Sequence, residues 1–170
     1  MRNKYRAFAL PANADTLQSN DPLPPARHAP ADAAFTWPVR VYYEDTDAAG
    51  LVYYASYLRF MERARTEALR ALGFEQSRVM REHGVAFVVR SAAIDFLRAA
   101  ALDDELGVGV SLEQLGASLI VFAQRIVRGE ELLASARVKV ACVRIGQLRP
   151  ARIPAAIREQ LERFRSCPQA

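Results

Sequence analysis

Hydrophobic and polar positions follow two different spacings along this 170-residue chain. Alternation over residues 35–43 predicts a first β-strand. Over residues 53–72 the apolar positions recur at intervals of three and four, which predicts a helix that Gly73 ends. We expect its apolar stripe to comprise Leu58, Met61, Arg65, Leu69 and Leu72. Three alanines, Ala64, Ala68 and Ala71, make one side of this helix slim, so a sheet is expected to approach it closely.

A period of two returns after Gly84 and predicts four more strands. Their expected ranges are 85–97, 105–114, 118–128 and 131–145, with a short turn or helix before them at 75–83. The links between the strands are too short for parallel crossovers, so successive strands should pair antiparallel. Pro154 and an apolar stripe of Ile157, Leu161 and Phe164 predict a final helix over residues 154–165. The order of elements predicts an α+β fold, in which an antiparallel sheet wraps one long central helix.

Proline and glycine divide the chain into three parts. Residues 1–34 are rich in proline and alanine and lack a periodic pattern, which is typical of a disordered extension. The apolar run at residues 7–10 is too short for an export signal, and no stretch is long enough to span a bilayer, so we expect a cytoplasmic protein without a membrane span. Residues 35–150 are expected to form the folded domain, and residues 151–170 a helix and tail.

Composition and charge narrow the classes of function. Hydrophobic residues make up 51% and charged residues 25% of the chain, as in a folded domain with a core. Two cysteines, Cys142 and Cys167, are too few for a disulfide framework, so both are expected to be reduced thiols. The net charge of +4 resides in residues 144–170, which hold six arginines and two glutamates. This local excess favours a solvated basic helix or an anion site, and no nucleic-acid partner is expected.

Several familiar catalytic sets are missing from the sequence. There is no Gly-x-Ser-x-Gly motif, and the two histidines, His28 and His83, lie in the extension and beside a turn. Gly107 and Gly109 lack the third glycine of a dinucleotide fingerprint, and no phosphate-binding Gly-x-x-x-x-Gly-Lys motif occurs. We expect no metal site.

The segment at residues 44–50, EDTDAAG, is the remaining candidate for chemistry. One interpretation is a polar loop that caps the following helix, with Asp45 or Asp47 accepting backbone hydrogen bonds. A phosphotransferase centre built on Asp45 and Asp47, with Asp103 and Asp104 as a distant acidic pair, is a weaker alternative because the chain does not alternate strand and helix. The third interpretation places a carboxylate beside the unpaired N–H groups of the following helix, as acyl transfer requires. A thioester suits such a site because its thiol leaves without a general acid.

The string VRVYYEDTDAAG at residues 39–50, continued by LVYYASYL, closely resembles the hotdog-fold acyl-CoA thioesterases of the YbgC type, in the 4-hydroxybenzoyl-CoA thioesterase group. The resemblance covers about residues 37–160. It implies a five-stranded antiparallel sheet around the central helix, with Asp47 as general base or nucleophile. It also implies that the backbone N–H of Tyr54 polarises the thioester carbonyl. Many relatives have histidine at that position, so Tyr54 is a departure.

The resemblance further implies a homodimer with a continuous sheet, active sites at the dimer interface and assembly to a homotetramer. Acyl-CoA is the implied substrate, with acyl carrier protein as an alternative carrier, no separate cofactor, and a link to the Tol-Pal envelope system. Because coenzyme A carries phosphates, we expect Arg90, Arg149 and Arg152 to contact it and Ser118 to line the pantetheine channel. The alternative hypothesis is a non-catalytic module that binds acyl thioesters and reports to a lipid or envelope partner.

Overall fold

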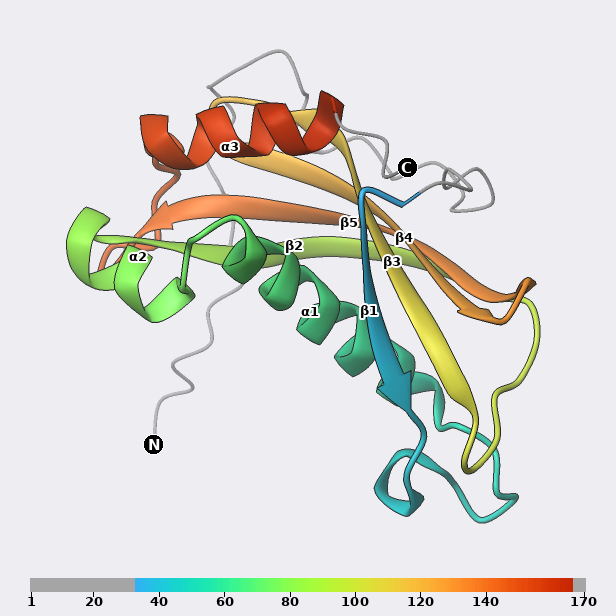
Figure 1. The fold of residues 1–170 in the computed structure, drawn as a ribbon. Helices are drawn as coiled ribbons and strands as arrows, with labels where there is room; N and C mark the ends of the chain where they lie inside the picture. The colour runs from blue at the N-terminus through green and yellow to red at the C-terminus, as the bar shows by residue number, and fades with distance from the viewer. Residues whose placement is uncertain (1–32, 167–170) are drawn as a thin grey trace, which may run out of the picture.

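The computed structural model describes residues 33–166, in which five strands and three α-helices form one layered unit (Figure 1). The extension predicted for residues 1–34 therefore lies almost entirely outside the described residues, as do His28 and Cys167. The elements are β1 (Phe35–Arg40), a 3-10 turn (Tyr43–Asp45), α1 (Tyr54–Ala71), α2 (Gln76–His83), β2 (Val85–Phe96), β3 (Glu105–Leu115), β4 (Leu119–Arg128), β5 (Glu131–Arg144) and α3 (Ala155–Ser166).

All five strands pair antiparallel in one sheet, in the order β1-β3-β4-β5-β2. The predicted five-stranded sheet around a central helix is thus confirmed. The predicted pairing of each strand with the next is wrong for β2, which pairs with β5 and not with β3, because the loop after β2 carries the chain to the far side of the sheet. The two edge strands differ in kind. β1 has six residues and contains Pro38, which donates no backbone hydrogen bond, whereas β2 has twelve residues and leaves one side unpaired.

Helix α1 crosses the sheet with Ala64 and Ala68 inward, as the alanine spacing predicts, whereas Ala71 at its last position is exposed. Ala64 and Ala68 are buried there together with Tyr57, Phe60 and Met61, and they pack on apolar side chains of β3, β4 and β5. The predicted stripe was wrong at its start, because Leu58 is 39% exposed. The buried positions begin instead at Ser56 and Tyr57, where the Ser56 hydroxyl donates to the Asp45 carbonyl and the Tyr57 hydroxyl accepts the Ala100 N–H.

The first strand is shorter than the predicted range of 35–43. It ends at Arg40 because the backbone then turns at Tyr43–Asp45, where the Asp45 and Thr46 N–H groups donate to the carbonyls of Tyr42 and Tyr43. The final helix begins at Ala155, and Pro154 precedes it and accepts a hydrogen bond from the Arg158 N–H at 2.9 Å. Both differences arise from local hydrogen bonds that alternation alone does not report.

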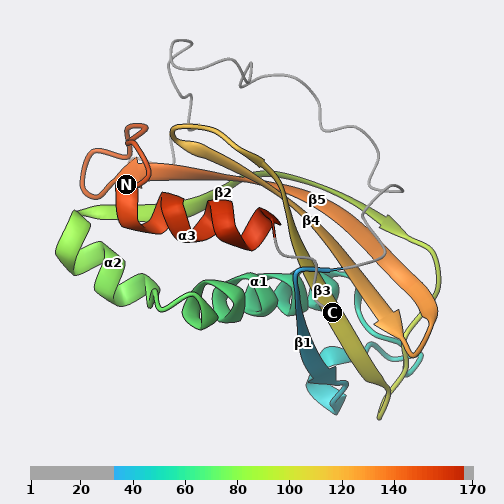
Figure 2. The same ribbon diagram turned by 45° about the horizontal axis from the view of Figure 1, so that its top comes forward.

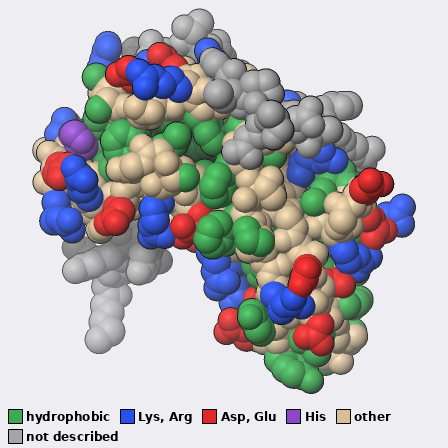
Figure 3. All heavy atoms as spheres, in the orientation of Figure 1, with side chains coloured by type: hydrophobic (Ala, Val, Ile, Leu, Met, Phe, Trp, Pro, Cys, Tyr) green, Lys and Arg blue, Asp and Glu red, His purple; other side chains and the backbone are tan. Residues whose placement is uncertain are grey.

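All three helices lie on the same face of the sheet (Figures 1 and 2). Helices α2 and α3 share an apolar cluster with the second half of α1, centred on Val79, Ile157, Leu161 and Cys142. Burial raises the pKa of the Cys142 thiol to about 11, so this thiol stays protonated at neutral pH. In the space-filling view, apolar side chains form a band between α3 and the helices beneath it (Figure 3). No helix among the described residues is long and apolar enough to cross a membrane.

Candidate active site

The segment between β1 and α1 folds back on itself as a short antiparallel ladder. The Tyr53 N–H donates to the Asp45 carbonyl at 2.9 Å, Thr46 pairs with Val52, and the Asp47 N–H donates to the Leu51 carbonyl at 2.9 Å. Because Tyr53 directly precedes α1, Asp47 lies two ladder positions from the helix start, about 7 Å along the strand direction. The sequence predicted that a carboxylate lies near the start of the helix, and the ladder holds Asp47 there.

Asp45 is buried and its carboxylate is used by the loop itself. Its side chain is 2% exposed, accepts the Tyr42 N–H at 3.1 Å and lies 3.4 Å from Arg59. Its backbone carbonyl accepts both the Tyr53 N–H and the Ser56 hydroxyl at 3.0 Å. Asp45 therefore anchors the loop to the first turn of α1, and its carboxylate is not available to a ligand.

We expect Asp45→Ala to lower the free energy of unfolding by about 1–3 kcal/mol, because the Tyr42 N–H loses its acceptor and the buried Asp45 side chain leaves a gap. Asp47→Ala is the matched control, since Asp47 is exposed and its loss should cost under about 0.5 kcal/mol. Urea unfolding of both variants measures the difference. Equal stability of the two would contradict the structural role of Asp45.

Asp47 occupies the tip of the ladder. One carboxylate oxygen accepts the Ala49 N–H at 2.9 Å, and the Asp47 carbonyl accepts the Gly50 N–H at 3.0 Å. Gly50 has a φ of +74°, a conformation that favours glycine, and it closes the turn. The Asp47 side chain is exposed and pairs with no arginine or lysine among residues 33–166. In one chain the carboxylate thus faces solvent rather than a closed cleft.

Helix α1 begins without a side-chain cap. Its N-cap is Tyr53, which makes no side-chain hydrogen bond, and only the Ser56 N–H reaches back to the Tyr53 carbonyl, at 2.8 Å. Within the described part of the chain, the N–H groups of Tyr54 and Ala55 have no acceptor. These donors carry the positive end of the helix dipole, and they are suited to an oxygen that gains negative charge.

A second loop, between β2 and β3, supports this arrangement. The Val52 N–H donates to the Ala100 carbonyl at 2.8 Å, and Leu51 pairs with Ala101. Asp104 holds that loop by accepting the Ala101 N–H at 2.8 Å and Arg128 at 2.7 Å. Burial acts to raise the pKa of Asp104, but these hydrogen bonds outweigh it and place the pKa below its ordinary value. Asp104 is therefore a structural carboxylate, and Asp103 and Asp104 form no acidic pair with Asp47.

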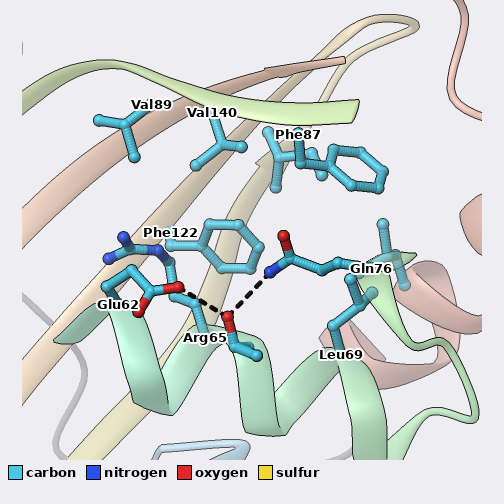
Figure 4. A pocket seen from close by; sticks show the side chains of 11 residues that line it. Glu62, Arg65, Leu69, Gln76, Phe87, Val89, Phe122 and Val140 are labelled. Carbon is cyan, nitrogen blue, oxygen red and sulfur yellow. Dashed lines mark hydrogen bonds between the residues drawn. The ribbon is translucent and has the colours of Figure 1, made fainter. Parts of the chain in front are cut away.

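A pocket of about 510 Å³, counted with its open mouth, lies between α1, α2, the sheet and α3 (Figure 4). Its apolar wall comes from Leu69, Phe87, Val89, Ile120, Phe122, Val140 and Leu161. Its polar wall comes from α1 and α2, where the Gln76 amide donates to the Thr66 hydroxyl at 2.8 Å and that hydroxyl donates to Glu62 at 2.8 Å. The chain of hydrogen bonds joins the two helices beside an apolar interior.

Arg65 lies on the wall of this pocket and is held by a second hydrogen-bonded pair. Its guanidinium donates to the Gln124 side chain, whose amide donates to the Met61 carbonyl at 2.9 Å. Burial lowers the pKa of Arg65 to about 10, although the nearby Glu62 acts in the opposite direction. Arg65 therefore remains charged at neutral pH, with its charge directed to Gln124 rather than to the centre of the pocket.

Asp47 lies near the start of α1, whereas the pocket lies beside the second half of that helix. The α1 residues that line it run from Glu62 to Leu69, which are about 12–22 Å beyond Tyr54 along the helix axis. The start of β2 borders the pocket through Phe87 and Val89, whereas the end of β2 lies near the helix start, where the ring centroids of Phe96 and Tyr57 are 5.4 Å apart. One subunit alone does not bring the carboxylate and the pocket together.

The other predicted site residues lie away from Asp47 in the single chain. Arg90 is the extra residue of a bulge in β2, between Val89 and Ser91. Ser118 and Arg152 meet at Cys142, which donates its N–H to the Ser118 carbonyl at 2.8 Å and its thiol to the Arg152 carbonyl at 3.7 Å. The Arg149 carbonyl accepts the Arg144 N–H at 2.8 Å at the same end of the sheet, beside the start of β2.

Sequence reasoning missed the polar wall of the pocket. Glu62 and Thr66 come from α1 and Gln76 from α2, and only the helical spacing of Glu62 and Thr66 was visible in the chain. Sequence reasoning also missed Gln124, which lies behind the wall and binds Arg65. Gln124 had a usable signal, because it is a polar residue at an inward position of an otherwise apolar strand. Among residues 33–166, no group of three or more potential metal ligands comes together.

Comparison with known proteins assigns the family. Residues 41–161 match the model of the thioesterase-like superfamily. The chain is 49% identical over 127 residues to an acyl-CoA thioesterase YbgC of Haemophilus influenzae, covering 75% of this chain and 93% of the relative. The chain belongs to the YbgC branch of this superfamily. The resemblance predicted from residues 39–50 is thereby confirmed.

Solved structures agree with the hotdog arrangement. A probable thioesterase from Bartonella henselae matches with a TM-score of 0.68 at 36% identity, over 70% of this chain and 98% of that one. A 1,4-dihydroxy-2-naphthoyl-CoA thioesterase from Synechocystis matches with a TM-score of 0.70 at 26% identity, over 75% and 94% of the two chains. Members of this YbgC branch are acyl-CoA thioester hydrolases by name, and the described fold is theirs.

Proposed function

We propose that the protein hydrolyses acyl-CoA thioesters, with Asp47 activating the attack and the N–H groups at the start of α1 binding the carbonyl oxygen. The observation that carries this proposal is an exposed carboxylate, Asp47, that bonds only within its own turn and lies two ladder positions from the unpaired N–H groups at the start of α1. Membership of the YbgC branch supports the choice of acyl-CoA. Asp45 is excluded from this role because its carboxylate is buried and bonded within the loop.

The chemistry needs few groups. Attack on the thioester carbon moves negative charge to the carbonyl oxygen, which the Tyr54 and Ala55 N–H groups stabilise by hydrogen bonds. The carbon–sulfur bond then breaks and the sulfur leaves as thiolate, because a thiol with a pKa near 8.5 needs little protonation. Asp47 either takes a proton from the attacking water or attacks the carbon itself, and water then cleaves the resulting anhydride. Both routes yield a free acid and coenzyme A.

Tyr54 stands where many relatives have histidine. In this mechanism the backbone N–H of Tyr54 acts, and its side chain, 60% exposed, lies beside the ring of Tyr53 at a centroid distance of 4.5 Å. Hydrogen bonding and charge interaction with Tyr54 raise the pKa of the Tyr53 phenol, which stays neutral at neutral pH. The departure from histidine is consistent with an oxyanion hole made by the main chain.

The site is completed by a second copy of the chain. Strand β2 is the long edge of the sheet, and Val89 and Phe96 on it are 54% and 48% exposed. An antiparallel pair of β2 strands about a twofold axis brings the start of each strand opposite the end of its partner. The pocket at Phe87 and Val89 then faces the partner's Asp47 loop. This supports the predicted homodimer, from which a tetramer would be assembled.

The same pairing gives the basic end of the chain a role. Arg144, Arg149 and Arg152 lie beside the start of β2 and make no ion pair among the described residues. In the dimer they approach the partner's Asp47 loop, where the phosphates of coenzyme A would lie. Ser118 lies at this end as well, whereas Arg90 lies near the middle of β2 and so near the twofold axis. Acyl carrier protein, with its phosphopantetheine arm, is the alternative carrier of the acyl group. The protein is predicted to act in the cytoplasm, with a link to the Tol-Pal envelope system.

The proposed function is tested by thiol release from a panel of acetyl-, hexanoyl-, dodecanoyl- and benzoyl-CoA, with and without a chelator. We expect turnover on at least one ester at a rate of about 1–10³ per second that chelation leaves unchanged, because the mechanism uses no metal. Acyl-CoA binding without thiol release would favour the non-catalytic module instead. Loss of activity with the chelator would contradict the mechanism.

A further inference from the structure

Three short segments form a small sheet beside the start of α1. The first carries Asp47, the second is residues 51–52, which lead into the helix, and the third is residues 100–101 of the loop between β2 and β3. The Asp47 N–H donates to the Leu51 carbonyl at 2.9 Å, and the Val52 N–H donates to the Ala100 carbonyl at 2.8 Å. The middle segment is held from both sides, so the position of Asp47 relative to the helix start depends on the third segment as well.

The carboxylate of Asp104 joins the third segment to the main sheet. A single oxygen, Oδ2, accepts the Ala101 N–H at 2.8 Å and the Arg128 guanidinium at 2.7 Å. Arg128 ends β4 and also pairs with Glu131, the first residue of β5, at 2.6 Å. Hydrogen bonds between charged groups are stronger than those between neutral ones. Asp104 therefore ties the third segment to the β4–β5 hairpin.

The other side of the same loop is bonded to α1. Tyr57, in the first turn of the helix, is 3% exposed, and its hydroxyl accepts the Ala100 N–H at 2.9 Å. Its ring meets the ring of Phe96 edge-on at a centroid distance of 5.4 Å, where β2 ends and the loop begins. Because the loop is bonded to the sheet through Asp104 and to the helix through Tyr57, it fixes the start of α1 relative to the sheet.

We propose that Asp104 positions the reacting groups for thioester hydrolysis, because its hold on the third segment sets the place of the Asp47 carboxylate relative to the N–H groups that begin α1. The proposal rests on the proposed function, in which these two groups act on the thioester together. Asp104 acts through the loop and does not touch the thioester, so it is a positioning residue and not a catalytic one. A displacement of about 1 Å between reacting groups lowers a rate by as much as about 10²-fold.

The first test is the kinetics of Asp104→Ala on the thioester that the wild type cleaves fastest. We expect kcat to fall about 10- to 10²-fold while KM changes less than about threefold, because the lost interaction aligns the reacting groups and binds no substrate. Asp104→Asn keeps an oxygen for the Ala101 N–H and should return kcat to within about fivefold of the wild type.

Glu113→Ala is the matched control. Glu113 in β3 pairs with Arg137 in β5 at 2.8 Å, and its side chain is 27% exposed, compared with 20% for Asp104. It lies nine residues beyond Asp104, about 30 Å further along the strand. Both alanine variants remove the acid of a partly buried ion pair, so both should lower the thermal midpoint by about 2–8 °C. Glu113→Ala should nevertheless keep the wild-type kcat.

Hydrogen exchange provides a readout that needs no turnover. In Asp104→Ala, amides in residues 46–54 should exchange about tenfold faster or more than in the wild type, because the third segment no longer holds the Val52 N–H. In Glu113→Ala the same amides should exchange at the wild-type rate. Faster exchange confined to Asp104→Ala separates positioning of the ladder from a general loss of stability.

Each outcome decides the matter. Wild-type kcat in Asp104→Ala, or an equal loss of kcat in Glu113→Ala, would overturn the proposal. If Asp104→Ala does not fold, Arg128→Met, which removes the partner of the carboxylate, is measured in its place with the same expected changes. If the wild type cleaves no ester, the proposed function fails, and exchange then tests the proposal separately: faster exchange in residues 46–54 supports positioning of the Asp47 ladder by Asp104, and wild-type exchange overturns it.

Discussion

Asp47→Asn should lower kcat for acyl-CoA hydrolysis by about 10²- to 10⁴-fold, because an amide neither accepts a proton from water nor attacks the thioester. The change keeps the shape of the side chain, and its oxygen still accepts the Ala49 N–H that closes the turn. We therefore expect an unchanged thermal midpoint and a KM close to that of the wild type. Steady-state thiol release and a thermal melt measure the three quantities.

Glu44→Gln is the matched control for this experiment. Glu44 is an exposed carboxylate in the same loop, and only its backbone carbonyl makes a described contact, with Arg59. This variant should keep the wild-type kcat. Wild-type kcat in Asp47→Asn, or an equal loss in both variants, would remove Asp47 from the mechanism and leave only a general electrostatic effect of the loop.

Mixed dimers should recover activity that neither parent possesses. Asp47→Asn removes the carboxylate, and Leu69→Trp fills the pocket at the far end of α1. If each site combines the Asp47 of one subunit with the pocket of its partner, a mixed dimer keeps one intact site of two. Random 1:1 co-assembly produces mixed dimers in half of the cases, so we expect about a quarter of the wild-type activity.

A site formed within one subunit predicts a different activity for the mixed dimer. If the carboxylate and the pocket acted within one subunit, both sites of a mixed dimer would be defective and co-assembly would recover nothing. Met80→Trp is the control for adding a bulky side chain, because Met80 lies exposed on α2 and does not line the pocket. Co-assembly of Asp47→Asn with Met80→Trp should exceed a quarter of the wild-type activity, since intact Met80→Trp dimers add their own sites.

The structure changes how the acidic segment is understood. The sequence left open whether Asp45 or Asp47 serves as a structural group, and the contacts separate the two. Asp45 is buried under Arg59 and bonded to Tyr42, whereas Asp47 projects from the tip of the ladder. Both accept backbone hydrogen bonds, as the polar-loop interpretation predicted, but from loop residues rather than from α1. In one subunit the Asp47 side chain is exposed, and this makes the second subunit necessary to the proposal.

Local features of the sequence determined most of the architecture. Alternation and tight turns specify the hairpins β3-β4 and β4-β5, because each hairpin pairs residues that are near neighbours in the chain. The pairing of β2 with β5 joins distant segments, and local pattern does not specify it. The alanines of α1 specify the slim face, since only small side chains allow the sheet to approach. The sequence around Asp47 identified the family, because a loop that forms a ladder and then starts a helix restricts nearly every residue in it.

Tertiary structure alone decided where the parts of the site lie. The pocket joins side chains as distant in the chain as Glu62 and Leu161, and no periodicity reports which of them meet. The exposure of Leu58 and the early end of β1 also depend on packing and hydrogen bonds outside the local pattern. The separation of Asp47 from the pocket follows from the length of α1, because a straight helix carries its two ends apart. A sequence states how long that helix is, whereas only the folded chain shows that one end holds the carboxylate and the other end the cavity.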